Sequence, residues 1–164
     1  MDLQLIISIL LTLMPLIELR GGMPVAIQYA ISHNYPIWFV FILIVIVNIL
    51  IIPIVFLFLD YLNKFFLKFN FYQKFFNFFL ERARKKAEKV EKQMKVWGFL
   101  ALAIFVGIPL PLTGAYTGCL IAWILNLDRK KSILAISAGV VIAAVLVFLA
   151  SLGLFRVWLF SIKV

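Results

Sequence analysis

Residues 108–118 read IPLPLTGAYTG and lie in the middle of an uncharged run that extends from residue 97 to residue 127. Proline cannot donate a backbone hydrogen bond, and glycine adopts conformations that a helix does not offer, so this stretch predicts a break in a helix. The run is longer than the roughly 20 residues of one membrane span. We therefore expect a helical hairpin over residues 97–127, with Pro109, Pro111 and Gly114 at its tip.

A second interruption lies near the N-terminus, where residues 14–24 read MPLIELRGGMP. The apolar segments on either side are too short, at about 1.5 Å per helical residue, to cross a hydrocarbon core of about 30 Å. We expect another hairpin over residues 3–32 that turns back at mid-depth. Its Glu18 and Arg20 are charged side chains at a depth where they are costly unless they are paired or hydrated.

The composition indicates an integral membrane protein that forms one domain over residues 1–164. Hydrophobic residues make up 65% of the chain and charged residues only 14%, far from the balance of a soluble domain. One cysteine and one histidine leave no thiolate or histidine cluster for a metal. No phosphate-binding loop, dinucleotide motif or catalytic triad can be assembled, so we expect neither a cofactor nor enzymatic activity.

Two uncharged stretches have the length of a tilted transmembrane helix, residues 36–59 and 132–155. Asn48 lies near the middle of the first, where an amide either makes a packing hydrogen bond or belongs to a transport pathway. Residues 61–96 combine aromatic and basic side chains, which predicts a helical connector in the membrane interface. Basic residues beside a span usually signal topology, so we do not expect the connector to bind nucleic acid.

The two halves of the chain, residues 1–60 and 97–164, correspond to each other at a shift of 93 residues. Each contains a hairpin followed by one transmembrane helix. A re-entrant hairpin adds no membrane crossing, so the second half is inverted relative to the first. We therefore expect an all-α integral membrane protein with two inverted-topology repeats; hairpins that span the bilayer completely would give the same parity. The positive-inside rule places the connector in the cytoplasm of a multi-pass protein of the cell (inner) membrane.

The two interruptions supply the candidate site. Glu18 and Arg20 are either a structural ion pair or the walls of a watery cavity, in which Arg20 holds an anionic group and Glu18 binds a proton or sodium ion. Helix N-termini at Gly21 and Gly114 would aim amide donors at the same anion. The residues expected to bind substrate or ion are Glu18, Arg20, Gly21, Gly22, Pro24, Asn48, Pro109, Pro111, Thr113, Gly114, Tyr116 and Thr117.

Residues 18–24 and 109–118, together with the chain length, resemble the small multidrug export family of prokaryotic membrane proteins. That family is more remotely similar to the DedA, or VTT-domain, superfamily. The resemblance to DedA implies two facing re-entrant hairpins and movement of polyprenyl phosphate or phospholipid, with proton or sodium coupling in some members. DedA proteins typically carry an arginine after the aromatic motif of the second hairpin, whereas here both charges lie in the first.

These features predict a transporter that moves an amphiphilic anionic lipid, either a polyprenyl phosphate or a phospholipid. One alternative is an exporter of small solutes or cationic drugs, with Glu18 as the cation site. Another is a non-transporting membrane organiser that binds anionic lipid through residues 61–95. The expected partners are membrane lipids and a coupling ion, and the small residues of the 132–155 span favour a homodimer.

Overall fold

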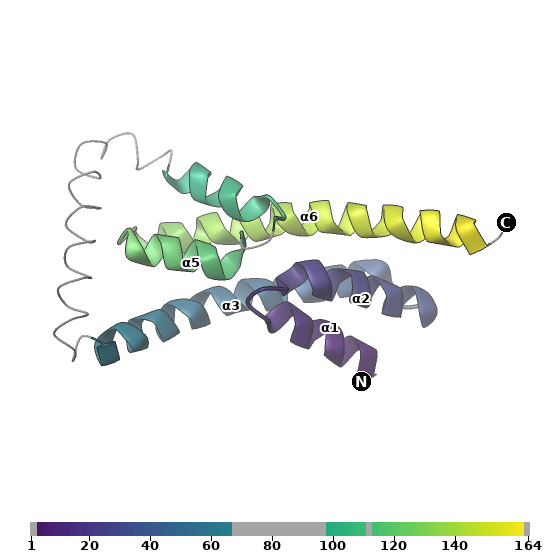
Figure 1. The fold of residues 1–164 in the computed structure, drawn as a ribbon, viewed down its shortest axis with the longest axis horizontal. Helices are drawn as coiled ribbons and strands as arrows, with labels where there is room; N and C mark the ends of the chain where they lie inside the picture. Colours follow the sequence, from purple (N-terminus) through teal and green to yellow (C-terminus); the bar gives the residue numbers. More distant parts are fainter. Residues whose placement is uncertain (1–2, 67–97, 111–112, 163–164) are drawn as a thin grey trace.

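A computed structural model describes residues 3–66, 98–110 and 113–162, and the regular structure within these ranges is entirely helical. Most of the 61–96 connector lies outside the described residues. The helices in chain order are α1 (Leu3–Leu13), α2 (Glu18–Ser32), α3 (Ile37–Phe66), the helix Gly98–Gly107, α5 (Ala115–Ile124) and α6 (Arg129–Ile162) (Figure 1).

Two of these helices are long and apolar enough to cross a membrane. The candidate spans are Ile37–Leu62 in α3 and Arg129–Gly153 in α6, with 26 and 25 residues. A helix of that length extends about 38 Å, which exceeds a hydrocarbon core of about 30 Å. Both helices begin close to the predicted spans and continue beyond their predicted C-terminal ends. The architecture is that of a membrane protein.

The other described helices are too short to span a bilayer alone. The helices α1, Gly98–Gly107 and α5 contain 10 or 11 residues, which corresponds to about 15 to 17 Å. The longest of the short helices, α2, has 15 residues and extends about 22 Å. These lengths fit the hairpins that the sequence predicts, while their depth and orientation in a bilayer stay predictions.

The long helices α3 and α6 form the centre of the packing. They contact each other, and each of them also contacts both α2 and α5. In Figure 1 the first hairpin lies along one side of α3, and α5 lies beside α6. Large apolar side chains cover the outside, including Leu57 and Leu134, which are 66% and 64% exposed. A membrane protein is expected to present such a surface to lipid.

Small residues on α6 allow neighbouring helices to approach closely. A Cβ atom at Gly139 would lie 2.6 Å from the backbone oxygen of Ala103, so only glycine fits there. Ala135, Ala143 and Ala144 are also buried within the chain. These residues therefore pack inside the molecule and give no argument for the homodimer, which stays a prediction.

The turns that follow α2 and α5 have the same geometry. Asn34 and Asn126 both adopt the left-handed conformation, with φ of 55° and 52°. Just beyond them, the Tyr35 N–H donates to the Ala30 oxygen at 2.9 Å, and the Leu127 N–H donates to the Ala122 oxygen at 3.0 Å. Both closures are of the type that satisfies the last carbonyls of a helix. Equivalent positions in these turns are separated by 92 residues, one fewer than the shift found in the sequence.

Candidate functional site

The first interruption breaks the helix earlier than its glycines predict. Helix α1 ends at Leu13 and α2 begins at Glu18, so Gly21, Gly22 and Pro24 lie inside α2. The prediction of a helix N-terminus at Gly21 is therefore wrong. The physical reason is packing: a Cβ atom at Gly22 would overlap the Thr12 hydroxyl, so this glycine lets α2 lie directly against α1.

The second interruption is a break between helices, as predicted. The Gly98–Gly107 helix ends before Pro109, and Gly114 is the N-cap residue of α5. Between them the Thr113 hydroxyl lies 2.7 Å from the Ile108 backbone oxygen and accepts from the Leu110 N–H at 3.2 Å. These bonds close the turn. Pro111, which was also predicted to belong to the site, lies outside the described residues.

Glu18, from the first hairpin, caps the N-terminus of α5 in the second hairpin. Its carboxylate accepts hydrogen bonds from the N–H groups of Ala115 and Tyr116, each at 3.3 Å. These amides lie in the first turn of α5, where N–H groups have no partner within their own helix, and the positive end of the helix dipole favours an anion. Glu18 is only 5% exposed and has a φ of 51°, which is unusual for a residue other than glycine.

Gly114 makes room for this carboxylate. A Cβ atom at Gly114 would overlap Oε2 of Glu18 and come within 2.5 Å of Cδ. Any side chain at this position would push the carboxylate away from the amides of α5. Glycine is thus required here for close approach rather than for an unusual backbone angle.

Arg20 also reaches across to the second hairpin. Its Nη2 donates to the backbone oxygen of Thr113 and lies 3.2 Å from the Thr113 hydroxyl. Within the described part of the chain, Nε and Nη1 of Arg20 have no hydrogen-bond partner, and no ion pair joins Arg20 to Glu18. The structure therefore does not have the mutual ion pair that was one interpretation of the sequence. Both charged side chains bind the second hairpin instead.

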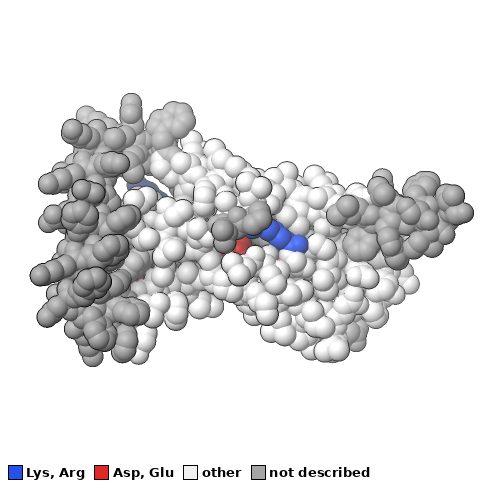
Figure 2. Space-filling model, viewed as in Figure 1, with Lys and Arg blue, Asp and Glu red and all other residues white. Residues whose placement is uncertain are grey.

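Tyr116 makes a contact from the second hairpin back to the first. Its hydroxyl donates to the backbone oxygen of Leu13, the last residue of α1, at 2.5 Å. We call this set of contacts, formed by Leu13, Glu18 and Arg20 with residues 113–116, the tip junction. In Figure 2 one positive and one negative area lie side by side on a described surface that is otherwise mostly white. Thr117 is half-buried, and no hydrogen bond joins it to the junction in the ranges that the structure describes.

The chain matches the family described as "Putative small multi-drug export protein" over residues 18–146. It belongs to this family. The match begins at Glu18 and ends within α6, so it includes the charged residues of the tip junction, all of α3 and about half of α6. No curated protein and no solved structure matches the chain.

In this export-family protein, Asn48 is a buried polar residue of α3. It is 0% exposed, and neither its Nδ2 nor its Oδ1 has a partner among the described residues. The Cys119 thiol of α5 lies 3.8 Å from the Ile52 backbone oxygen of α3. Nearer the C-terminal ends of both helices, the Trp123 indole N–H of α5 donates to the Asp60 carboxylate of α3. The two helices therefore run in the same direction. Asn48 lies one turn before Ile52, and Ala115 lies one turn before Cys119.

The sequence did not predict a second polar cluster, which joins three helices of the export-family protein. Both Arg129 Nη atoms bind the Asp60 carboxylate, at 2.7 and 2.9 Å, and the Trp123 indole N–H donates to the same carboxylate at 3.0 Å. The Arg129 guanidinium also lies 5.1 Å from the centre of the Phe56 ring. The only signal in the sequence was that Asp60 and Arg129 border the two apolar spans. Their side chains are 37% and 45% exposed, so this cluster fixes helix ends rather than forming a buried site.

Proposed function

We propose that this export-family protein moves an anionic amphiphile across the membrane through the tip junction. The substrate is a membrane lipid with a phosphate group, either a polyprenyl phosphate or a phospholipid. One observation carries the proposal: the amides of α5 already hold an anion, the carboxylate of Glu18, beside the Arg20 guanidinium. The substrate phosphate would take the place of this carboxylate.

The donors at the tip junction suit a phosphate. Two backbone amides at a helix N-terminus bind the oxygens of an anion, and a guanidinium binds phosphate in a bidentate way. The amides of Ala115 and Tyr116 supply such donors, and so do the two Arg20 nitrogens that have no partner among the described residues. Charged side chains within a membrane are rare and mark substrate or ion pathways.

The contacts of Glu18 favour a proton rather than sodium as the coupling ion. Sodium requires several oxygen ligands, whereas the described partners of the Glu18 oxygens are N–H donors. Protonation removes the charge that holds Glu18 at the positive end of α5 and weakens both bonds. The amides then become free for the substrate, so uptake of a proton and binding of the anion favour each other.

The same proposal includes two inverted repeats with re-entrant hairpins and a cytoplasmic connector. It is supported by the short hairpin helices, by the equivalent turns at Asn34 and Asn126, and by the contact between Arg20 and Thr113, which lie 93 residues apart. In inverted-repeat transporters, broken helices from the two repeats meet near the bilayer midplane. The relationship to the DedA superfamily stays a prediction.

Lipid translocation in proteoliposomes tests the proposed function. Purified protein is reconstituted into vesicles that contain a fluorescent phosphatidylglycerol or a fluorescent phosphatidylcholine, and the movement of label between leaflets is followed by quenching from outside. We expect faster movement of the anionic lipid, increased by a proton gradient and unchanged by a sodium gradient. Equal or absent movement of both lipids, with protein shown to be folded, would contradict the proposal.

A second candidate is export of organic cations. The family description names multi-drug export, and many drugs are amphiphilic cations, for which the Glu18 carboxylate would be the binding group. Efflux of tetraphenylphosphonium from the same vesicles separates the two functions. A cation exporter would lose efflux in Glu18→Gln and keep it in Arg20→Gln, because only Glu18 would contact the substrate.

A further inference from the structure

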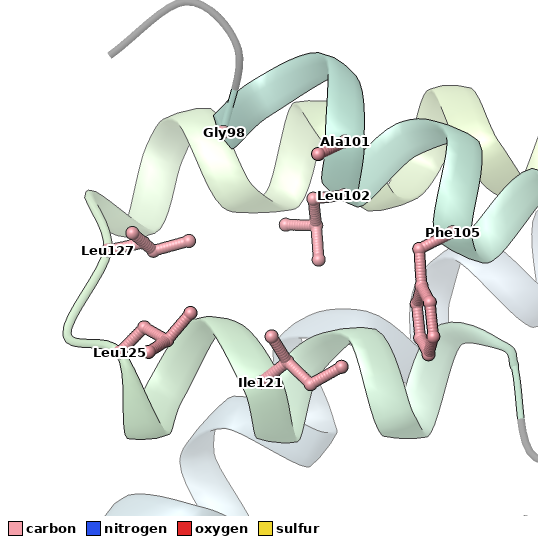
Figure 3. Close-up of a pocket in the computed structure, with 7 residues that line it drawn as sticks. All are labelled: Gly98, Ala101, Leu102, Phe105, Ile121, Leu125 and Leu127. Atoms are coloured by element: carbon pink, nitrogen blue, oxygen red, sulfur yellow. The ribbon is translucent and has the colours of Figure 1, made fainter. Parts of the chain in front are cut away.

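A cavity of about 420 Å³ lies within the second hairpin, between the Gly98–Gly107 helix and α5. Figure 3 shows side chains from both helices and from the following turn that point into the space between them. The lining residues are Gly98, Ala101, Leu102, Phe105, Ile121, Leu125 and Leu127. None of the lining side chains that the structure describes carries a polar group, so the cavity suits a hydrocarbon chain rather than a solute with charges.

The cavity runs along the hairpin from its open end towards its tip. Leu127 and Gly98 lie at one end in Figure 3, and Phe105 lies at the other, on the side where α5 begins. Ile121 is six residues beyond Ala115, about 9 Å along the helix. The apolar space therefore begins a short distance from the amides that hold Glu18.

The first hairpin is packed differently. Helices α1 and α2 approach so closely that a Cβ atom at Gly22 would lie 2.6 Å from the backbone oxygen of Ser8. The buried hydroxyls of Ser8 and Thr12 bond to oxygens of their own helix. The two hairpins thus differ in the space between their arms, which the sequence correspondence between the two halves did not predict.

We propose that the cavity binds a hydrocarbon chain of the same anionic lipid whose phosphate binds at the tip junction. This inference rests on the proposed function. A polar site a short distance from an apolar cavity is complementary to an amphiphile, with the headgroup at Arg20 and the chain between Phe105 and Ile121. The chain would lie towards the ends of the hairpin arms at Gly98 and Leu127, the side that leads to the basic connector.

Photo-crosslinking in vesicles tests this site. The probe is phosphatidylglycerol with a diazirine near the end of one acyl chain, present as a minor component of phosphatidylcholine vesicles, and labelled residues are identified by mass spectrometry. We expect residues 98–105 and 121–127 to be labelled several-fold more than the exposed apolar residues of α6. A probe with the same chain and a choline headgroup should not show this preference. Equal labelling by the two probes would mean that bulk lipid fills the cavity and would overturn the proposal.

Two variants each add a phenyl ring, one inside the cavity and one outside it. Ala101→Phe adds a ring to the lining of the cavity, whereas Ala150→Phe adds it to an exposed position of α6 outside the cavity. We expect Ala101→Phe to reduce labelling of residues 121–127 several-fold and Ala150→Phe to leave it unchanged. Ile121→Trp is a second cavity variant, used if Ala101→Phe does not fold. Unchanged labelling in a folded cavity variant would contradict the site.

The chain site and the proposed function can fail separately. Headgroup-selective labelling of the cavity without movement of phosphatidylglycerol in the translocation assay would keep the site and overturn the function. Lipid movement that requires Arg20, combined with equal labelling by the glycerol and choline probes, would keep the function and overturn the chain site.

Discussion

Arg20 in α2 binds both the backbone oxygen and the side-chain hydroxyl of Thr113, which lies 93 residues later, in the turn before α5. Glu18 accepts hydrogen bonds from the N–H groups of Ala115 and Tyr116 in the first turn of α5. Two charges from one hairpin thus bind the backbone of the other. A transport step that separates the hairpins must replace both contacts.

Arg20→Gln should lower the rate of anionic lipid movement by roughly tenfold to a hundredfold, because hydrogen bonds to charged groups contribute about 1.5–3 kcal/mol. The rate is measured in proteoliposomes with fluorescent phosphatidylglycerol. Arg129→Gln is the matched control, since Arg129 binds Asp60 outside the tip junction. Equal losses in the two variants would show that the effect is one of fold rather than of substrate binding.

Glu18→Gln should make transport independent of the proton gradient. A neutral amide cannot be held by charge at the α5 N-terminus and cannot release a proton, so anionic lipid should move at a similar rate with and without a gradient. The free energy of unfolding should fall by about 0.3–2 kcal/mol from the lost interaction with the helix dipole. A variant that keeps full gradient dependence would exclude Glu18 as the coupling group.

Gly114→Ala should destabilise the protein by about 1–3 kcal/mol, the usual cost of overpacking, because the new methyl group overlaps the Glu18 carboxylate. Thermal unfolding in detergent measures the change. In a Glu18→Ala background the same substitution should cost much less, since the group that it meets is gone. An equal cost in both backgrounds would place the strain elsewhere.

Asn48→Leu should raise the free energy of unfolding by about 1–3 kcal/mol, because it removes an amide that is buried with no described partner. The same variant should slow lipid movement several-fold if the amide serves the transport pathway. Ile52→Leu, one turn further along α3, is the control and should change neither quantity greatly. Greater stability with normal transport would assign Asn48 to packing alone.

Much of the fold could be predicted from charge and proline positions. Uncharged runs located α3 and α6, and Pro109 with Gly114 located the break before α5. The start of α2 was misplaced because Gly21 and Gly22 were interpreted as helix breakers. A glycine that allows two helices to touch has the same sequence signal as a glycine that ends a helix, and only the packing of Gly22 on Thr12 distinguishes them.

Five of the twelve residues predicted to bind substrate or ion meet at the tip junction, but their pairing was not predicted. Glu18, Arg20, Thr113, Gly114 and Tyr116 do come together. Their partners could not be predicted, because residues two apart in sequence suggest a mutual pair, while the contact with the second hairpin depends on how four helices pack. The Asp60–Arg129 pair was missed for the same reason, as it joins the ends of two helices distant in sequence.

In the proposed mechanism, a lipid phosphate displaces the Glu18 carboxylate from the amides of α5. The most direct test follows the backbone amide NMR signals of Ala115 and Tyr116 in nanodiscs as phosphatidylcholine is replaced by phosphatidylglycerol. We predict that both signals shift with the anionic lipid and that Arg20→Gln abolishes the shift. Signals that stay unchanged in folded wild-type protein across the whole titration would contradict the account.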